Sequence, residues 1–225
     1  MNAFNFSFIR SYKYTDNYIP IKVFVLKRIM DISLSFIALC VCLPLFPIIA
    51  GLIFLTSPGP VIFQQLRIGQ ADKNKTDIFW MYKFRTMRLD AEVASGAVWA
   101  TKNDPRVTMF GRFLRKTRLD ELPQLFNVLV GDMSLIGPRP ERPGFYQKLE
   151  AAIPYFAERT WGLKPGITGL AQVNQGYDRD LNDVRNKVAF DHAYALQLGN
   201  LRSWIFSDLQ IIFQTVIVMV TGRGQ

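Results

Sequence analysis

Histidine and cysteine are nearly absent from this sequence of 225 residues, which contains one histidine, His192, and two cysteines, Cys40 and Cys42. A four-ligand zinc site or a disulfide framework would need more of these side chains, so both are excluded. One histidine also excludes a multi-histidine metal centre and disfavours a serine–histidine catalytic relay. The two cysteines lie in an apolar stretch, where we interpret them as small apolar side chains.

Acidic residues are also scarce: 18 Asp and Glu residues stand against 27 Lys and Arg residues, a formal net charge of +9. With 49% hydrophobic residues the chain is too apolar to be disordered, and its length indicates one domain, or one domain with an appendage. A basic and apolar protein suits a membrane surface or a lipid phosphate. Nucleic acid would explain the charge alone, but no helix-turn-helix, zinc-finger or RNA-binding sheet motif is visible, so we expect no nucleic-acid partner.

The apolar excess is concentrated in one uncharged run of 24 residues, 32–55. About 20 helical residues cross a bilayer, but Pro44 and Pro47 interrupt this helix and leave arms too short to cross. Basic residues favour the cytoplasmic side of a membrane, and they flank the run at both ends: Lys22, Lys27 and Arg28 before it, and Arg67, Lys73, Lys75, Lys83 and Arg85 after it. We therefore favour a re-entrant membrane hairpin with its hinge at Pro44. A true span and a buried core hairpin are the alternatives.

The rest of the chain predicts a helix-rich α+β fold. Strands are expected at 61–65 and 77–84 around a polar turn, which is typical of a hairpin. Helical patterns cover 110–118, 121–130, 143–162 and 180–198, and KPGITG at 164–169 is expected to form a loop. A second apolar segment, 201–220, is interrupted by Asp208, which favours an interfacial amphipathic helix or a core helix over a span.

Three charged residues stand at the start of the apolar run. Lys27 and Asp31 are four residues apart and share a helix face, with Arg28 beside them. An ion pair at the membrane interface is one interpretation. The other is that Lys27 and Arg28 face lipid phosphates while Asp31 orients them.

Basic charge is densest between Gln64 and Arg118, where 12 lysines and arginines stand against five acidic residues. Attraction to anionic lipid headgroups explains part of this excess. Lys83 and Arg85 alternate with aromatic residues, so on a strand they would share one face and form a phosphate clamp.

The segment 115–132 carries the most informative pattern. Its apolar residues recur at helical spacing, and Pro123 is tolerated only in a first turn, so the helix should start just before it. Asp120 would then lie near the N-cap, where backbone N–H groups and the helix dipole keep a carboxylate ionised. With Arg115 and Arg118 upstream, Asp120 is either an anion that attacks phosphorus or binds a hard cation, or an ordinary helix cap.

Two further segments suit phosphate binding. Arg139 lies between two prolines, so its bidentate binding to a phosphate would cost little conformational freedom, although a structural turn is an equal alternative. Lys164 precedes two glycines in KPGITGLAQVN, a weaker signal because the spacing matches neither a P-loop nor a dinucleotide fingerprint.

Together these pieces resemble the bacterial sugar transferase family, the monotopic phosphoglycosyl transferases. The resemblance is carried by five motifs in the family's order: KRIMD (27–31), PGPVIFQQLRIG (58–69), YKFRTM (82–87), RLDELPQLFNVLVGDMSLIGPRPERP (118–143) and KPGITGLAQVN (164–174). It runs from about residue 22 to the C-terminus. One departure is Leu43 before Pro44, where many family members have serine.

The resemblance implies a sugar-1-phosphate transferase that uses Mg²⁺ with an Asp120–Glu121 dyad. Asp120 would attack the β-phosphate of a nucleoside diphosphate sugar, which we expect to be a UDP-sugar. The phosphosugar bound covalently to Asp120 would then be transferred to polyprenyl phosphate. Glu121 would bind or orient the metal. Arg115 and Arg139 would hold phosphates. Lys27 and Arg28 would lie by the lipid phosphate.

The expected organisation follows from the resemblance and from the apolar segments. It is an N-terminal tail or strap at 1–21, a re-entrant membrane hairpin at 22–56, a cytosolic catalytic domain at 57–200, and a C-terminal apolar interfacial or packing helix at 201–225. The expected location is the cytoplasmic face of the bacterial inner membrane, in contact with membrane lipids, as a monotopic protein and the minimal catalytic form of the family.

Two other readings remain at this point. One is a non-catalytic membrane-surface lipid-binding or scaffold protein in which Asp120 only caps a helix. The other is a metal-free, multi-span membrane protein. A homodimer is compatible with the sequence, although no heptad or symmetric patch indicates one, and no residue pattern identifies the sugar.

Overall fold

The computed structural model describes residues 18–72, 74–91, 104–176 and 180–221. Most of the predicted N-terminal tail at 1–21 therefore lies outside the described residues. In chain order the elements are α1 (Ile21–Cys42), α2 (Leu45–Thr56), β1 (Ile62–Ala71), β2 (Thr76–Phe84), α3 (Met109–Thr117), η1 (Leu119–Glu121), α4 (Gln124–Val130), β3 (Ser134–Ile136), α5 (Pro143–Ala152), η2 (Ala157–Thr160), β4 (Gly166–Thr168), α6 (Leu170–Asn174), α7 (Leu181–Gln197) and α8 (Leu201–Thr221). Two small sheets among helices confirm the helix-rich α+β prediction.

The first apolar run forms two helices, α1 and α2, which are bent by 63° at a short break. The break falls at Leu43–Pro44, as predicted, and Pro47 lies in the first turn of α2, where a missing N–H leaves no intrahelical bond unmade. Large apolar side chains of both helices face outward: Val41, beside the bend, is 72% exposed, and Leu55, at the far end of α2, is 79% exposed. An exposed apolar surface of this kind requires a partner.

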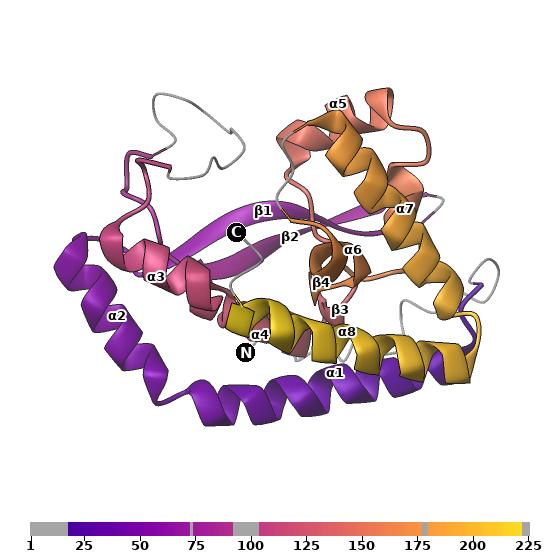
Figure 1. Cartoon of the computed structure of the whole chain (residues 1–225), viewed down its shortest axis with the longest axis horizontal. Helices are drawn as coiled ribbons and strands as arrows, with labels where there is room; N and C mark the ends of the chain where they lie inside the picture. Colours follow the sequence, from indigo (N-terminus) through magenta and orange to yellow (C-terminus); the bar gives the residue numbers. More distant parts are fainter. Residues whose placement is uncertain (1–17, 73, 92–103, 177–179, 222–225) are drawn as a thin grey trace, which may run out of the picture.

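The N-terminal half of α1 belongs to the main hydrophobic core. Val23 packs there with Tyr194 of α7 and with Trp204 and Ile211 of α8. Figure 1 shows α8 running alongside α1 at the lower edge of the molecule, and α2 turning up beside α3. The core therefore joins the beginning of the described chain to its end.

The predicted β-hairpin is confirmed. Strands β1 and β2 are antiparallel, with Gln65 opposite Met81 and Ile62 opposite Phe84. Strand β1 continues to Ala71, well beyond the predicted end at residue 65, because Leu66, Arg67 and Ile68 still pair with β2. This hairpin carries polar side chains toward α3 and the segment that follows β3.

The predicted loop at 164–169 contains a short strand, β4, that pairs in parallel with β3. Its glycine serves close packing of the two strands: a Cβ on Gly166 would lie 2.1 Å from the backbone N of Gly137. The glycine at this position is required because two backbone segments pack closely together. From the sequence alone, this cannot be distinguished from a glycine that lets the backbone approach a ligand.

The segment around Asp120 differs from the prediction. The helix α4 begins at Gln124, after Pro123, and its N-cap position belongs to Pro123. Asp120 and Glu121 lie instead in the separate 3₁₀ turn η1, which follows a chain reversal at Arg118 with a φ of 58°. The predicted N-cap position of Asp120 is therefore wrong, because the left-handed Arg118 ends α3 and starts a turn of its own before α4.

The helix predicted at 143–162 is split into α5 and η2. Pro154 requires an extended residue before it, and Ile153 is extended at φ −127° while Tyr155 has a φ of 60°. The helices predicted at 180–198 and 201–220 are confirmed as α7 and α8. Helix α8 is long and apolar enough to cross a membrane by length and composition, with Phe206, Phe213 and Val220 more than 60% exposed.

Candidate active site

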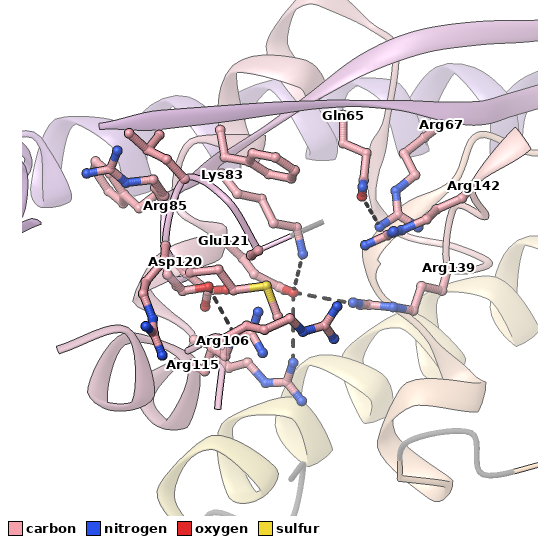
Figure 2. A pocket seen from close by; sticks show the side chains of 18 of the residues that line it. Gln65, Arg67, Lys83, Arg85, Arg106, Arg115, Asp120, Glu121, Arg139 and Arg142 are labelled. Atoms are coloured by element: carbon pink, nitrogen blue, oxygen red, sulfur yellow. Dashed lines mark hydrogen bonds and ion pairs between the residues drawn. The ribbon is translucent and has the colours of Figure 1, made fainter. Parts of the chain in front are cut away.

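A cavity of about 310 Å³ lies between the β-hairpin, α3, η1 and the segment 138–142. Its wall is strongly basic, and Figure 2 shows arginines on both sides of two adjacent carboxylates. The charged lining residues are Arg67, Lys83, Arg85, Arg88, Arg106, Arg115, Arg118, Asp120, Glu121, Arg139, Glu141 and Arg142. The cavity thus brings together six of the predicted site residues: Lys83, Arg85, Arg115, Asp120, Glu121 and Arg139.

Glu121 is the centre of a cationic cluster. Its Oε1 atom lies 3.0 Å from Lys83 Nζ, 3.7 Å from Arg139 Nη1 and 3.8 Å from Arg118 Nη1. Burial alone would raise the pKa of Glu121, but these three cations outweigh burial and lower its pKa to about 2. Glu121 is therefore ionised throughout the physiological range.

Asp120 has the opposite environment. It is 7% exposed, and its Oδ1 atom is buried without a hydrogen-bond partner among the described residues. Burial and then the negative charge of Glu121 raise the pKa of Asp120 to about 6, against the attraction of Lys83, Arg115 and Arg118. The expectation that the N-terminus of a helix stabilises the ionised form of Asp120 is wrong. Helix α4 begins only at Gln124, and no hydrogen bond from a described residue reaches Asp120 Oδ1. The dyad therefore pairs Glu121, which has a pKa of about 2, with Asp120, which has a pKa of about 6.

Lys83 and Arg85 both line the cavity, but they do not act as a matched clamp. Lys83 donates a hydrogen bond to Glu121. Burial lowers the pKa of Lys83, and the opposing attraction of Glu121 only partly offsets this effect. The guanidinium of Arg85 donates to the backbone oxygens of Ser57 and Pro58, in the turn that follows α2. Arg85 therefore connects the cavity directly to the end of the apolar helix pair.

Arg115 is positioned by a close approach between α3 and the segment after β2. Its Nε donates to Thr86 Oγ1 over 2.9 Å. A Cβ on Gly111 of α3 would lie 2.0 Å from the backbone oxygen of Thr86, so only glycine allows α3 to come this near. The guanidinium of Arg115 is thereby held beside Asp120 (Figure 2).

The sequence analysis missed a second group of cavity residues, on β1. Arg67 donates to Gln65 Oε1 over 2.6 Å and to the backbone oxygen of Pro140 over 2.9 Å. With Arg142 these side chains lie on the far side of Glu121 from Arg115 (Figure 2). The signal was available: Gln65 and Arg67 are two apart on a strand and must share a face, but the predicted strand ended at residue 65.

Lys27, Arg28 and Asp31 lie away from the cavity and are engaged inside the protein. Lys27 pairs with Asp208 of α8 over 3.0 Å, not with Asp31. Arg28 donates to the backbone oxygens of Val128 and Leu129, at the end of α4, over 2.6 and 2.9 Å. Asp31 accepts from Ser134 Oγ and the backbone N of Leu135. These contacts join α1 to α4 and β3, and the partner of Lys27 joins it to α8.

Lys164 also lies outside the cavity, near the turn that ends α4. A Cβ on Gly131 would come within 3.2 Å of Lys164 Nζ and 3.3 Å of Arg28 Nη2. Burial and the nearby Arg28 lower the pKa of Lys164 to about 8.

The predicted magnesium ion would be held by the adjacent carboxylates of Asp120 and Glu121. Among the described residues no group of three or more Asp, Glu, His or Cys side chains could hold a metal. Mg²⁺, however, is commonly bound by only one or two carboxylates together with substrate phosphates and water. The buried Oδ1 of Asp120, which has no hydrogen-bond partner in the described part of the chain, is an oxygen of the kind that Mg²⁺ binds.

Comparison with known proteins gives a consistent result. Residues 22–222 match the family model for bacterial sugar transferases. The chain is 44% identical over 205 residues to the UDP-N-acetylgalactosamine-undecaprenyl-phosphate N-acetylgalactosaminephosphotransferase of Aeromonas hydrophila, covering 91% of this chain and 46% of that protein. It is 40% identical over 205 residues to the UDP-glucose:undecaprenyl-phosphate glucose-1-phosphate transferase of Xanthomonas campestris, covering 90% of this chain and 39% of the relative.

A shorter relative matches along its whole length. The exopolysaccharide production protein PSS of Rhizobium leguminosarum is 42% identical over 206 residues, which is 89% of this chain and 98% of the relative. The chain thus spans less than half of the Aeromonas and Xanthomonas relatives but nearly all of the Rhizobium one. Since the family model covers almost every described residue, the chain belongs to the bacterial sugar transferase family.

Proposed function

We propose that this protein transfers a sugar-1-phosphate from a UDP-sugar to undecaprenyl phosphate, releasing UMP and forming undecaprenyl-diphosphate-sugar. The observation that carries the proposal is the buried Oδ1 atom of Asp120, unpartnered among the described residues and facing a cavity lined with arginines. The names of the Aeromonas and Xanthomonas relatives describe the same type of reaction. We propose further that this transfer is the first membrane step of polysaccharide or glycoconjugate assembly, because its acceptor is a lipid phosphate.

In the first step we place Asp120 as the nucleophile. One carboxylate oxygen attacks the β-phosphorus of the UDP-sugar, a new P–O bond forms, and the bond from that phosphorus to the bridging oxygen breaks, so that UMP leaves. A carboxylate can do this only when ionised, and a pKa of about 6 leaves Asp120 mostly ionised at neutral pH yet poorly solvated. Poor solvation favours attack because little water must be removed.

In the second step a phosphate oxygen of the lipid attacks the same phosphorus and regenerates the free carboxylate of Asp120. Transfer of a phosphoryl group depends chiefly on alignment and on charge neutralisation at the phosphate oxygens. Arg115 on one side and Arg139 on the other supply fixed positive charge there, while Glu121 keeps Lys83 and Arg139 in place. Magnesium held by Asp120 and Glu121 with the phosphates would add further neutralisation of that charge.

We further propose that the helix pair α1–α2 is re-entrant, which places the protein monotopically on the cytoplasmic face of the bacterial inner membrane. The support is the 63° bend at Leu43–Pro44, the exposed apolar side chains around it, and basic residues on both flanks. Arg85 bonds the turn that leaves α2. The cavity would therefore open near the height of the lipid phosphate.

The topology can be tested by cysteine labelling in intact spheroplasts. With Cys40 and Cys42 replaced by alanine, single cysteines at Lys22 and at Lys75, which is exposed, report the two flanks of the helix pair. Protection of both sites from an impermeant maleimide until the membrane is broken supports the re-entrant proposal. Labelling of one site only would establish a span.

The activity is tested with membranes, Mg²⁺, undecaprenyl phosphate and a panel of UDP-sugars that includes UDP-glucose and UDP-N-acetylgalactosamine. We expect UMP release with at least one sugar, reduced by about 10³-fold or more in Asp120→Asn. Asp77→Asn, an exposed carboxylate on β2, is the matched control and should retain wild-type rate. No UMP release from any sugar would favour a lipid-binding or scaffold protein.

The covalent step has its own readout. Omitting the lipid acceptor should give UMP in an amount equal to the enzyme, with the sugar phosphate retained on a peptide containing Asp120. UMP release that requires the lipid from the first turnover would show direct transfer without an aspartyl intermediate.

A further inference from the structure

The segment from Pro138 to Glu141 is held by every one of its backbone carbonyls. Pro138 O accepts from the backbone N of Gly166, and Glu141 O accepts from the backbone N of Ile68. Pro140 O accepts from Arg67, and Arg139 O accepts from the side chain of Arg159. Because two of the four residues are prolines without an N–H, carbonyl oxygens are the main backbone groups by which this segment can be fixed.

Arg159 is the only one of these donors on η2, and it is almost completely buried at 3% exposed. Its guanidinium is stacked over the ring of Phe156 at 5.0 Å and lies 4.0 Å from Glu141 Oε1. It does not line the cavity. Among the described residues it reaches the site through the backbone of Arg139 and the carboxylate of Glu141.

Asp191 of α7 fixes Arg159 from behind. Asp191 Oδ2 lies 3.3 Å from Arg159 Nε, and Asp191 is itself 2% exposed. A buried guanidinium has to be paired and hydrogen-bonded, since an unpaired charge in the interior is strongly destabilising. The pairing with Asp191 leaves the two terminal nitrogens of Arg159 directed at the segment 138–141.

We propose that Arg159, anchored on Asp191, is a positioning residue that sets the place of the Arg139 guanidinium opposite Glu121. Arg139 Nη1 lies 3.7 Å from Glu121 Oε1, at the position where it meets the transferred phosphate in the proposed reaction, on which this inference rests. Displacing a phosphate-binding guanidinium by about 1 Å can reduce a rate about 10²-fold. A buried pair in α7 and η2 thereby controls the geometry of the cavity without touching a substrate.

A double-mutant cycle separates positioning from a general contribution to folding. Arg159→Lys keeps the charge but loses the fork that reaches both Asp191 and Arg139 O. We expect it to lower kcat/KM for the UDP-sugar by about 10- to 100-fold in the wild-type background and by less than about twofold in an Arg139→Ala background. Equal losses in both backgrounds, or no loss in the wild type, would overturn the proposal.

Asp191→Asn, which preserves shape, should give the same pattern as Arg159→Lys at a smaller amplitude. Arg185→Lys, on the exposed side of α7, is the matched control and should leave kcat/KM unchanged in both backgrounds. Thermal unfolding midpoints of all variants identify any loss that comes from unfolded protein.

Hydrogen exchange tests the same inference without relying on activity. In Arg159→Lys the peptide spanning 137–147 should exchange faster than in the wild type, while the peptide spanning α4 should not change. Unchanged exchange at 137–147 would overturn the positioning role whatever the kinetics show. If the wild-type protein releases no UMP, the proposed function fails, while the exchange result still decides whether Arg159 holds the segment.

Discussion

Two buried aspartates, Asp120 in the cavity and Asp208 in α8, have nearly the same exposure and opposite surroundings. Asp208 is 1% exposed and receives hydrogen bonds on both oxygens: Lys27 Nζ at 3.0 Å, Trp204 Nε1 at 2.7 Å and Tyr194 OH at 2.8 Å. Asp120 is 7% exposed, and its Oδ1 has no hydrogen-bond partner among the described residues. One carboxylate is satisfied in full and the other is left in need of a partner.

The difference distinguishes a structural carboxylate, Asp208, from the proposed catalytic carboxylate, Asp120. A buried charge whose bonds are all made holds elements together, here α1, α7 and α8. A buried charge with an unmade bond destabilises the fold and is retained where function needs it. The two aspartates should therefore respond to the same substitution with opposite changes in stability.

The largest expected effect is that of Asp208→Asn. Removal of the charge leaves the partly buried Lys27 without its counter-ion, at a carboxylate that is itself almost fully buried, so the free energy of unfolding should fall by about 3–5 kcal/mol. Denaturant unfolding in detergent or nanodiscs measures this loss. Arg202→Gln, an exposed change on the same helix, is the control. If Asp208→Asn were as stable as the wild type, the Lys27–Asp208 pair would not have the structural role inferred for it.

Asp120→Asn should instead stabilise the protein while abolishing transfer. The raised pKa of Asp120 means that its ionised form is disfavoured in the fold, so the neutral amide should gain on the order of 1–3 kcal/mol above pH 6. The folded state holds this proton more tightly between the unfolded pKa of 3.8 and about 6. The difference between variant and wild type should therefore vanish below pH 4. A destabilised Asp120→Asn at pH 7.5 would contradict the comparison.

Arg28→Gln tests whether a residue predicted to bind lipid phosphate is structural. It loses two charged hydrogen bonds to the last carbonyls of α4, so unfolding free energy should fall by about 1–2 kcal/mol. The apparent KM for undecaprenyl phosphate should stay within about twofold of the wild type. A larger rise in that KM with unchanged stability would return Arg28 to the lipid site.

The smallest effect is expected in the pH profile. The value of kcat/KM should fall tenfold per unit below about pH 6, because the free enzyme then carries protonated Asp120. Glu121→Gln removes the like charge that raises this pKa, so the acid limb should move to lower pH by about half a unit to one unit. Asp191→Asn should leave the limb in place, although Asp191 also has a pKa raised to about 6 by burial.

Local pattern predicted the elements of this fold well. The break at Pro44, the β-hairpin and the helices α3, α7 and α8 follow from proline chemistry, strand alternation and helical spacing. The errors came from backbone exceptions: the left-handed Arg118 separates η1 from α4, and Pro154 divides the helix expected at 143–162. A positive φ at a non-glycine residue carries no local sequence signal.

The candidate site was predictable where residues lie close in sequence and unpredictable where they do not. Asp120 and Glu121 were found because they are adjacent and precede a helix. The partners of Lys27 and Arg28 were missed because they lie 181 and 100 residues away. Spacing along a helix suggested that Lys27 pairs with Asp31, and tertiary packing of α8 overrode that local choice.

The ion pair between Lys27 and Asp208 also cannot form until late in synthesis, because the two residues are 181 positions apart. A ribosome that adds about 5–20 residues per second exposes Lys27 roughly 10–40 s before it reaches Asp208. During that interval the ammonium of Lys27 and the apolar face of α1 around Val23 lack the helix that covers them. The nascent chain therefore exposes this apolar face until α8 has been synthesised and can pack against α1. A truncated product that stops before α8 would keep that face uncovered.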